Sequence, residues 1–154
     1  MSEQAPQVKH SELHLAIDEA AQAANVVGKH QREDYPGGYS EEIHGSNYLG
    51  GDAVSTDIGR SDDKWFKNRT NINMHVSRPS NPGEDPYHRA RTNYDVKMTG
   101  QIGARARIER TNEKGEVVYT HESKDAQLAR RIGMVGAKSI VRQSAIRAEA
   151  RKAA

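Results

Sequence analysis

Hydrophobic residues recur at three- and four-residue steps in two stretches, one near each end of the chain, and this spacing predicts two amphipathic helices. The first runs from about Ser11 to Lys29, with Ser11 as its N-cap and Gly28 at its end. Its predicted apolar stripe is rich in alanine and consists of Leu13, Ile17, Ala20, Ala24 and Val27. Such a stripe buries little area but allows close packing.

The second predicted helix starts near Lys124, with Ser123 as its N-cap. Its apolar arc includes Leu128, Ile132 and Val135. Small residues recur at every fourth position beside this arc, at Ala129, Gly133, Ala137, Val141 and Ala145. Glycine in a helix interior costs about 1 kcal/mol relative to alanine, so we expect a sheet or another helix to pack closely on this row.

Alternation of apolar and polar residues predicts strands in the middle of the chain. Ile72, Met74 and Val76 alternate with polar residues, and Trp65 and Phe66 are expected to anchor the start of this strand. The same alternation continues over 94–121. There Gly100 and Gly103 suggest a bulge or a close approach of another backbone, and residues 111–116 suggest a turn. The pattern predicts one long hairpin.

Two segments, 31–63 and 78–92, show neither period and are predicted to be long irregular loops. The first carries six glycines between positions 34 and 63, and the second carries three prolines. Tyr35, Tyr39 and Tyr48 lie in the first segment. Tyrosines in such a loop are typical of a partner interface, although they could also fix the loop to its own domain.

The fold class expected from these elements is α+β. A small antiparallel sheet with a long hairpin would pack against an N-terminal Ala-rich helix and a basic C-terminal helix. Residues 11–154 would form a single domain after a flexible N-terminus at 1–10. The expected core contains Met74, Met98, Ile102, Ile108, Val118, Leu128, Ile132 and Val135.

Composition suggests a chain that needs partners. Leu, Ile, Val and Phe supply only 24 of 154 residues, which is low for a domain that packs a core on its own. The chain has no cysteine, no apolar run long enough to span a membrane and a polar start. We therefore expect it in the cytoplasm, or in a particle assembled there.

Charge is unevenly distributed along the chain. The formal net charge is +2, but residues 124–152 carry +6 and the rest carries −4. This asymmetry predicts that the basic end contacts nucleic acid or an acidic partner, or else acidic surfaces of its own fold or oligomer. The candidate contact residues are Lys124, Arg130, Arg131, Lys138, Arg142, Arg147 and Arg151.

Motifs for catalysis do not emerge from the residue spacing. His10 and His14 are four apart and could share a helix face, but the zincin pattern needs Glu directly after the first His, where this chain has Ser11. We expect two exposed histidines there and no metal. No phosphate loop, dinucleotide fingerprint or nucleophile–base set is recognisable, so neither a cofactor nor an enzyme is expected.

These observations predict a non-enzymatic structural or adaptor subunit of a larger assembly, such as a viral or phage particle, that contacts copies of itself or other proteins. Its contacts would come from the loops, the hairpin and the basic C-terminal helix. The alternative is a nucleic-acid-associated protein that binds phosphates through that helix.

Overall fold

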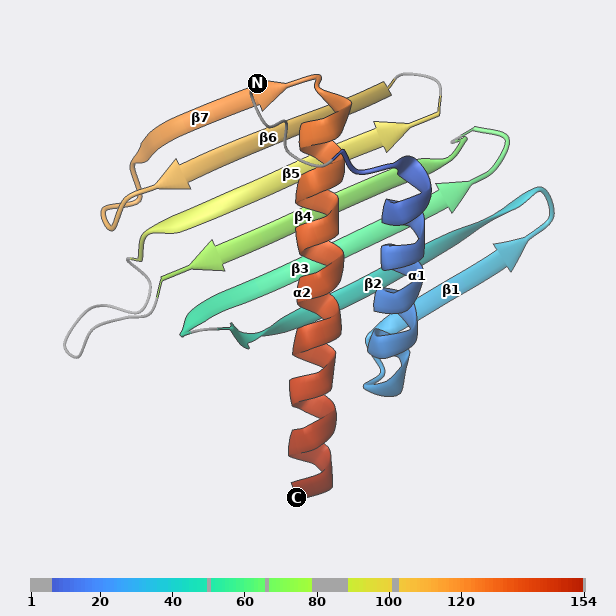
Figure 1. The fold of residues 1–154 in the computed structure, drawn as a ribbon, viewed down its shortest axis with the longest axis horizontal. Coiled ribbons are helices and arrows are strands. Elements are labelled where there is room, and N and C mark those ends of the chain that lie inside the picture. The colour runs from blue at the N-terminus through green and yellow to red at the C-terminus, as the bar shows by residue number, and fades with distance from the viewer. Residues whose placement is uncertain (1–6, 50, 66, 79–88, 101–102, 154) are drawn as a thin grey trace.

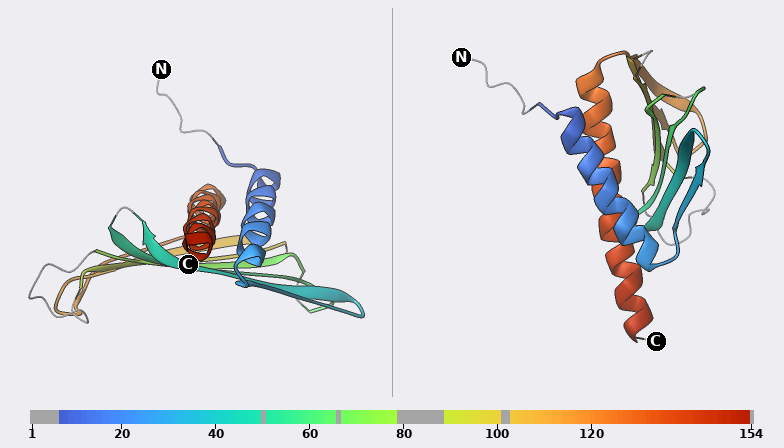
Figure 2. Two further views of the ribbon diagram at one scale, coloured as in Figure 1. Left: turned by 90° about the horizontal axis from the view of Figure 1, so that it is seen from below. Right: turned by 90° about the vertical axis from the view of Figure 1, so that its right-hand side faces the viewer.

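The computed structural model describes residues 7–49, 51–65, 67–78, 89–100 and 103–153. Within them, two helices lie on one face of a seven-stranded antiparallel sheet (Figures 1 and 2), which confirms the α+β class. The helices are α1 (His10–Val26) and α2 (Ala126–Ala153). Neither helix of the described part is long and apolar enough to cross a membrane.

Each strand of the sheet pairs with the next strand along the chain, in the order β1 to β7. The strands are β1 (His30–Tyr35), β2 (Gly38–Leu49), β3 (Asp52–Asp62), β4 (Arg69–Ser77), β5 (Arg91–Thr99), β6 (Gly103–Thr111) and β7 (Val117–Ser123). Every neighbouring pair is antiparallel, so the sheet is a simple meander with β1 and β7 at its edges.

The prediction of an irregular segment over 31–63 is wrong, because this segment forms β1, β2 and β3. Its helix-facing positions do alternate, but several carry residues that are not hydrophobic. Glu41, Thr56 and Arg60 are all buried there. A search for alternating hydrophobic residues therefore does not detect these strands.

The predicted single long hairpin is also wrong. Met98 pairs with Ala104, so the chain reverses between β5 and β6. Gly100 and Gly103 flank this reversal and are not parts of a bulge within one strand. The second reversal, at 112–116, is the predicted turn, and it joins β6 to β7.

Helix α1 has the predicted apolar stripe. All five stripe residues are buried. Gly28 has φ +73°, and the backbone N–H groups of Gly28 and Lys29 donate to the carbonyls of Asn25 and Ala24, which closes the helix. The start differs from the prediction, because the helix begins at His10 with Lys9 at the N-cap position. Ser11 is inside it.

Helix α2 begins slightly later than predicted. The backbone N–H of Gln127 donates to Asp125 Oδ1 at 2.9 Å, so Asp125 is the N-cap and Ser123 precedes it. Before α1, Val8 is hydrogen-bonded to the Gln127 side chain through both its N–H and its carbonyl. Residues 1–6 of the predicted flexible N-terminus lie outside the described residues.

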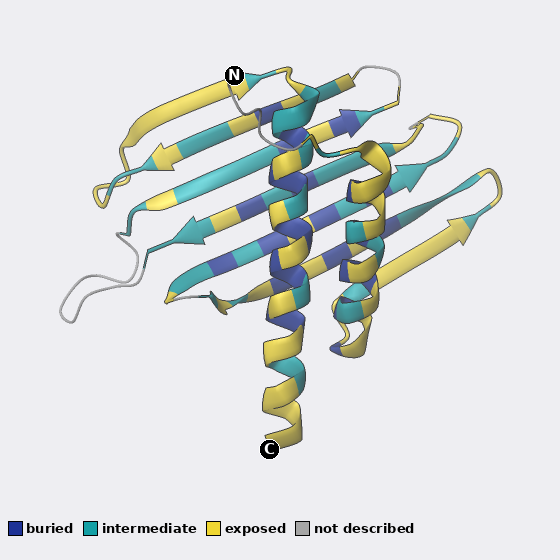
Figure 3. Cartoon of the chain, in the orientation of Figure 1, coloured by how far each residue is buried: buried dark blue, intermediate teal, exposed yellow. Residues whose placement is uncertain are grey.

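The core fills the space between the helices and the sheet (Figure 3). Of the expected core residues, Met74, Met98 and Ile132 are buried. Ile108 and Leu128 are only partly buried. Val118 and Val135 are exposed, and Ile102 lies outside the described residues.

Trp65 is 80 % exposed and does not anchor β4 as predicted. Phe66 lies outside the described residues. The largest fully buried side chains come instead from residues such as Leu13, Ile43 and Ile72. The core therefore forms around aliphatic rather than aromatic side chains.

Close approach of α2 to the sheet explains its interior glycines. A Cβ added at Gly133 would lie 2.9 Å from Ile72 Cδ1 and from Leu13 Cδ1, and one at Gly136 would lie 3.1 Å from Ile72 Cγ2. Ile72 on β4 thus fits against the helix backbone where α2 crosses the sheet. The close packing expected for the row of small residues is present at its buried members Ala129, Gly133 and Ala137, while Ala145 at the end of the row is exposed.

We expect Gly133→Val to lower the free energy of unfolding by about 1–3 kcal/mol, because the new side chain overpacks the contact with Ile72 and Leu13. The control is Ala145→Val, which adds a β-branched residue at an exposed position of the same helix. Denaturant unfolding would measure both variants. Equal stability of the two would contradict the close contact.

Candidate binding groove beside α2

One side of α2 is open. Helix α1 lies along one flank of α2, and no helix of the described chain covers the sheet on the other flank (Figure 2). A groove of about 530 Å³ lies there, along α2. Its apolar lining comes from β2, β3, β4, β5 and α2, and consists of Leu49, Val54, Met74, Val76, Tyr94, Ile132 and Val135.

Val135 is the most accessible part of this lining. Its side chain stands on α2 and is 56 % exposed, although it falls on the arc that predicted a core position. Val54 and Met74 beneath the groove are buried by their neighbours in the sheet. The groove is therefore a continuation of the core that the two helices leave uncovered.

Three cations line the α2 side of the groove, namely Arg131, Lys138 and Arg142. Together with Val135 they fall within about 60° around the helix axis, at 100° per residue. None of them forms an ion pair or hydrogen bond with another residue in the described part of the chain. The groove thus combines an apolar lining with three positive charges that lack a partner.

Three other predicted contact residues are bonded within the chain. Arg130 donates to the carbonyl of Val8 at 3.4 Å, and Arg151 donates to the carbonyls of Val26 and Val27 at the end of α1. A cation near the last carbonyls of a helix interacts favourably with the helix dipole. The third, Arg147, bonds a strand of the sheet. Lys124 lies just before α2 and is exposed.

Arg147 covers part of a sheet edge. β1 pairs with β2 only up to Ile43, which leaves the end of β2 at the edge of the sheet. There the Arg147 guanidinium donates to the Ser46 carbonyl from Nε at 3.0 Å and from Nη2 at 2.6 Å. A covered carbonyl cannot pair with a foreign strand, so this contact protects the edge.

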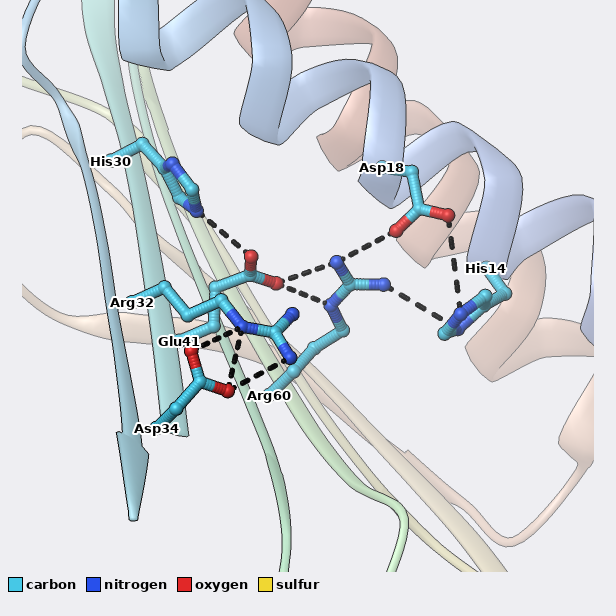
Figure 4. A network of polar contacts seen from close by, with 7 residues as sticks. All are labelled: His14, Asp18, His30, Arg32, Asp34, Glu41 and Arg60. Atoms are coloured by element: carbon cyan, nitrogen blue, oxygen red, sulfur yellow. Dashed lines mark hydrogen bonds and ion pairs between the residues drawn. The ribbon is translucent and has the colours of Figure 1, made fainter. Parts of the chain in front are cut away.

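A second polar site, the α1–sheet network, lies between α1 and strands β1 to β3 (Figure 4). Arg60 on β3 is 6 % exposed and donates from Nε to Glu41 Oε1 at 2.8 Å and from Nη2 to Asp18 Oδ1 at 2.8 Å. His30 Nε2 lies 2.8 Å from the other Glu41 oxygen. His14 Nδ1 lies 3.4 Å from Arg60 Nη1.

This network joins α1 to strands β1, β2 and β3. Arg60, Glu41 and His30 do not line the groove beside α2. Glu41 is 4 % exposed, and its carboxylate is fully engaged by Arg60 and His30. The arrangement fixes α1 to β2 and β3, which leaves the opposite side of α2 uncovered.

We expect Glu41→Ala to lower the free energy of unfolding by about 3–5 kcal/mol, because it leaves the buried Arg60 guanidinium without its main partner. Glu42→Ala is the matched control, since Glu42 is the next residue of β2 and its side chain faces solvent. Thermal or denaturant unfolding would measure both. A network that contributes nothing would give two variants of equal stability.

The three predicted interface tyrosines have different surroundings. Tyr35 Oη donates to Asp63 Oδ2 at 2.7 Å and to the Tyr39 carbonyl at 3.2 Å, so it joins the β1–β2 turn to the end of β3. The Arg32 guanidinium lies 4.2 Å from the centre of the Tyr39 ring. Tyr48 is 63 % exposed near the end of β2. These positions do not form one patch around a common centre.

The hydrogen bond from Tyr35 to Asp63 raises the pKa of Tyr35 above its usual value of 10.0. Its contribution to stability is therefore complete below pH 10 and is lost as the pH rises through the raised pKa. Tyrosinate absorbance, taken as wild type minus Tyr35→Phe, would give the Tyr35 titration curve. We expect Asp63→Asn to move this curve to lower pH, and an unmoved curve would contradict the bond.

The other face of the sheet is polar, and several of its charges are paired across neighbouring strands. His44 bonds Asp57, and His75 bonds Asn93. Arg107 contacts Glu109 at 3.1 Å and Glu122 at 3.4 Å. Such pairs on an exposed sheet face satisfy one another in solvent.

Neither the histidine pair nor any other described cluster forms a metal site. The His10 and His14 rings are stacked, with centroids 6.5 Å apart. Within the described residues, no group of three or more His, Asp or Glu side chains is placed to hold a metal ion.

The search of family models, curated proteins and solved structures finds no match to this chain.

The cations of the groove were predictable from the sequence, but the assembly of its lining from four strands and a helix was not. The floor comes from β2 to β5, and two of these strands lie in the segment predicted to be a loop. The one signal in the sequence was the surplus of apolar positions on the second helix. Val135 extends the apolar arc of that helix toward the cations, beyond the part of the arc that is buried against the sheet.

Proposed function

We propose that this protein is a non-enzymatic assembly subunit that binds a protein partner through the groove beside α2. Its setting would be the cytoplasm or a particle assembled there, of which a viral or phage particle is one example. The observation that carries the proposal is an apolar groove, left open by the two helices, beside three cations that have no partner among the described residues. Segment 31–63, which was predicted to be a contact loop, forms strands β1, β2 and β3. Helix α2 is therefore the main contact element of the proposal.

The apolar lining favours a protein partner. Exposed apolar patches with polar rims are typical of protein interaction sites, and here Val135 and Tyr94 lie beside Arg131 and Lys138. A partner that covered the lining would remove apolar area from water, which gives about 25 cal/mol for each Å² buried. Carboxylates at its margins would meet the three cations.

Nucleic-acid binding is the weaker alternative. Phosphate binding needs cations that are free to meet a backbone, and Arg130, Arg147 and Arg151 donate to carbonyls of this chain instead. Arg131, Lys138 and Arg142, which have no partner in the described part of the chain, border an apolar lining that offers nothing to phosphates. A salt titration of DNA and RNA binding would separate the two functions.

The mass of the native particle tests the proposal. The chain would be isolated gently at low salt from the cells that make it, and we expect a mass above the 17.1 kDa of one copy. We expect Val135→Asp to reduce that mass, because a carboxylate on the lining opposes burial. Val117→Asp is the matched control, since Val117 is 55 % exposed and lies on β7.

Either of two results would overturn the proposal. One is a native species with the mass of a single copy. The other is a larger particle that both valine variants leave unchanged, because the groove would then have no part in its contacts. Circular dichroism of both variants would check that the fold is kept.

A further inference from the structure

A second surface of the same chain is complementary to the groove. Helix α1 buries one face against α2 and the sheet, and its opposite face is open to solvent. The residues of this open face, which we call the α1 stripe, are Glu12, Leu15, Glu19, Gln22 and Val26. At 100° per residue they fall within about 80° around the axis of α1.

The α1 stripe carries two large aliphatic side chains and two carboxylates. Leu15 is 63 % exposed and Val26 is 69 % exposed, so both aliphatic side chains can be reached by a second molecule. The carboxylates of Glu12 and Glu19 form no ion pair or hydrogen bond with another described residue. The nearby Asp18 differs, since it is bonded to Arg60.

The spacing of charges on the two helices matches. Glu12 and Glu19 are seven residues apart with Leu15 between them, and Arg131 and Lys138 are seven residues apart with Val135 between them. Seven residues of helix span about 10.5 Å, so both pairs of charges repeat at the same distance. The α1 stripe can therefore align its two carboxylates with Arg131 and Lys138 of the groove while Leu15 meets Val135.

The two stripes of one molecule cannot meet each other. α1 lies on the flank of α2 opposite the groove, and its stripe faces away from the core (Figures 1 and 2). The α1–sheet network holds α1 in that place, and Arg151 fixes the end of α1 to α2. The α1 stripe is therefore available only to another molecule.

We propose that the α1 stripe of one copy docks on the groove beside α2 of a second copy. This inference rests on the proposed function and names the partner of the same groove as this chain itself. Leu15 would contact Val135 and the apolar lining, while Glu12 and Glu19 would meet Arg131, Lys138 and Arg142. Because the two surfaces differ, each copy carries both halves of the contact.

Charge reversal of either half tests the contact with purified full-length chain. Sedimentation at low salt would compare wild type with Glu12→Lys/Glu19→Lys and with Arg131→Glu/Lys138→Glu. We expect each double variant to weaken self-association about tenfold or more, since like charges would then face each other. Raising the salt concentration should weaken the wild-type association by screening.

Mixing the two double variants supplies the decisive measurement. The α1 stripe of Glu12→Lys/Glu19→Lys then carries lysines that face the glutamates in the groove of Arg131→Glu/Lys138→Glu. The unchanged α1 stripe of the second variant keeps its wild-type pairing with the unchanged groove of the first. We expect the mixture to regain association to within about threefold of wild type. Lys97→Glu/Lys114→Glu is the matched control for the groove variant, because it makes the same change in net charge at exposed residues off the groove.

Three results would overturn the inference. These are a purified wild type that stays at the mass of one copy at every concentration, reversals no stronger than the control, and a mixture that does not recover. A monomeric purified chain beside a larger native particle with other proteins would remove this inference and leave the proposed function standing. Loss of DNA or RNA binding in Arg131→Glu/Lys138→Glu, with self-association unchanged, would be a case of the second result and would favour the nucleic-acid alternative.

Discussion

The contact between α2 and the centre of the sheet determines the layout of this protein. Gly133 and Gly136 let the helix backbone approach Ile72, where a Cβ would lie 2.9 to 3.1 Å from that side chain. Gly45 on β2 makes a similar contact, since a Cβ there would lie 3.1 Å from Ile140 Cγ1. Because interiors are close-packed, these three glycines fix where α2 crosses the strands.

The position of α1 follows from that crossing and from the α1–sheet network. Its alanines pack against α2, and its Asp18 reaches Arg60 beneath it. A buried arginine needs its partners in place, because an unpaired charge in the interior is expensive. The network is therefore better understood as a constraint on where α1 lies than as a source of net stability.

With α1 held on one flank, the other flank of α2 stays open, and this asymmetry links the fold to the proposed function. A short chain with few large aliphatic residues covers only part of its sheet with two helices. The uncovered part carries Val135 and Tyr94 beside three cations, while the outer face of α1 carries Leu15 and Val26 beside two carboxylates. The shortage of core residues that composition shows thus corresponds to surfaces suited to a second molecule.

The sequence by itself determined the elements whose burial repeats locally. The buried apolar face of α1 was predictable because Leu13, Ile17 and the alanines recur at helical spacing. Strand β4 was predictable because Ile72 and Met74 alternate with polar residues. The seven basic positions and their uneven distribution were also readable. The groove lining was not, since its residues come from strands that are distant in sequence.

Only the tertiary structure decided the first three strands and the fate of the basic residues. Glu41, Thr56 and Arg60 are buried on the sheet because Asp18, His30 and Ser139 arrive from other elements to bond them. Whether an arginine bonds a carbonyl or stays unpartnered likewise depends on which backbone lies near it, as Arg147 and Arg142 show. Burial of a polar residue is favourable only when its partner is present, and a linear pattern does not show that partner.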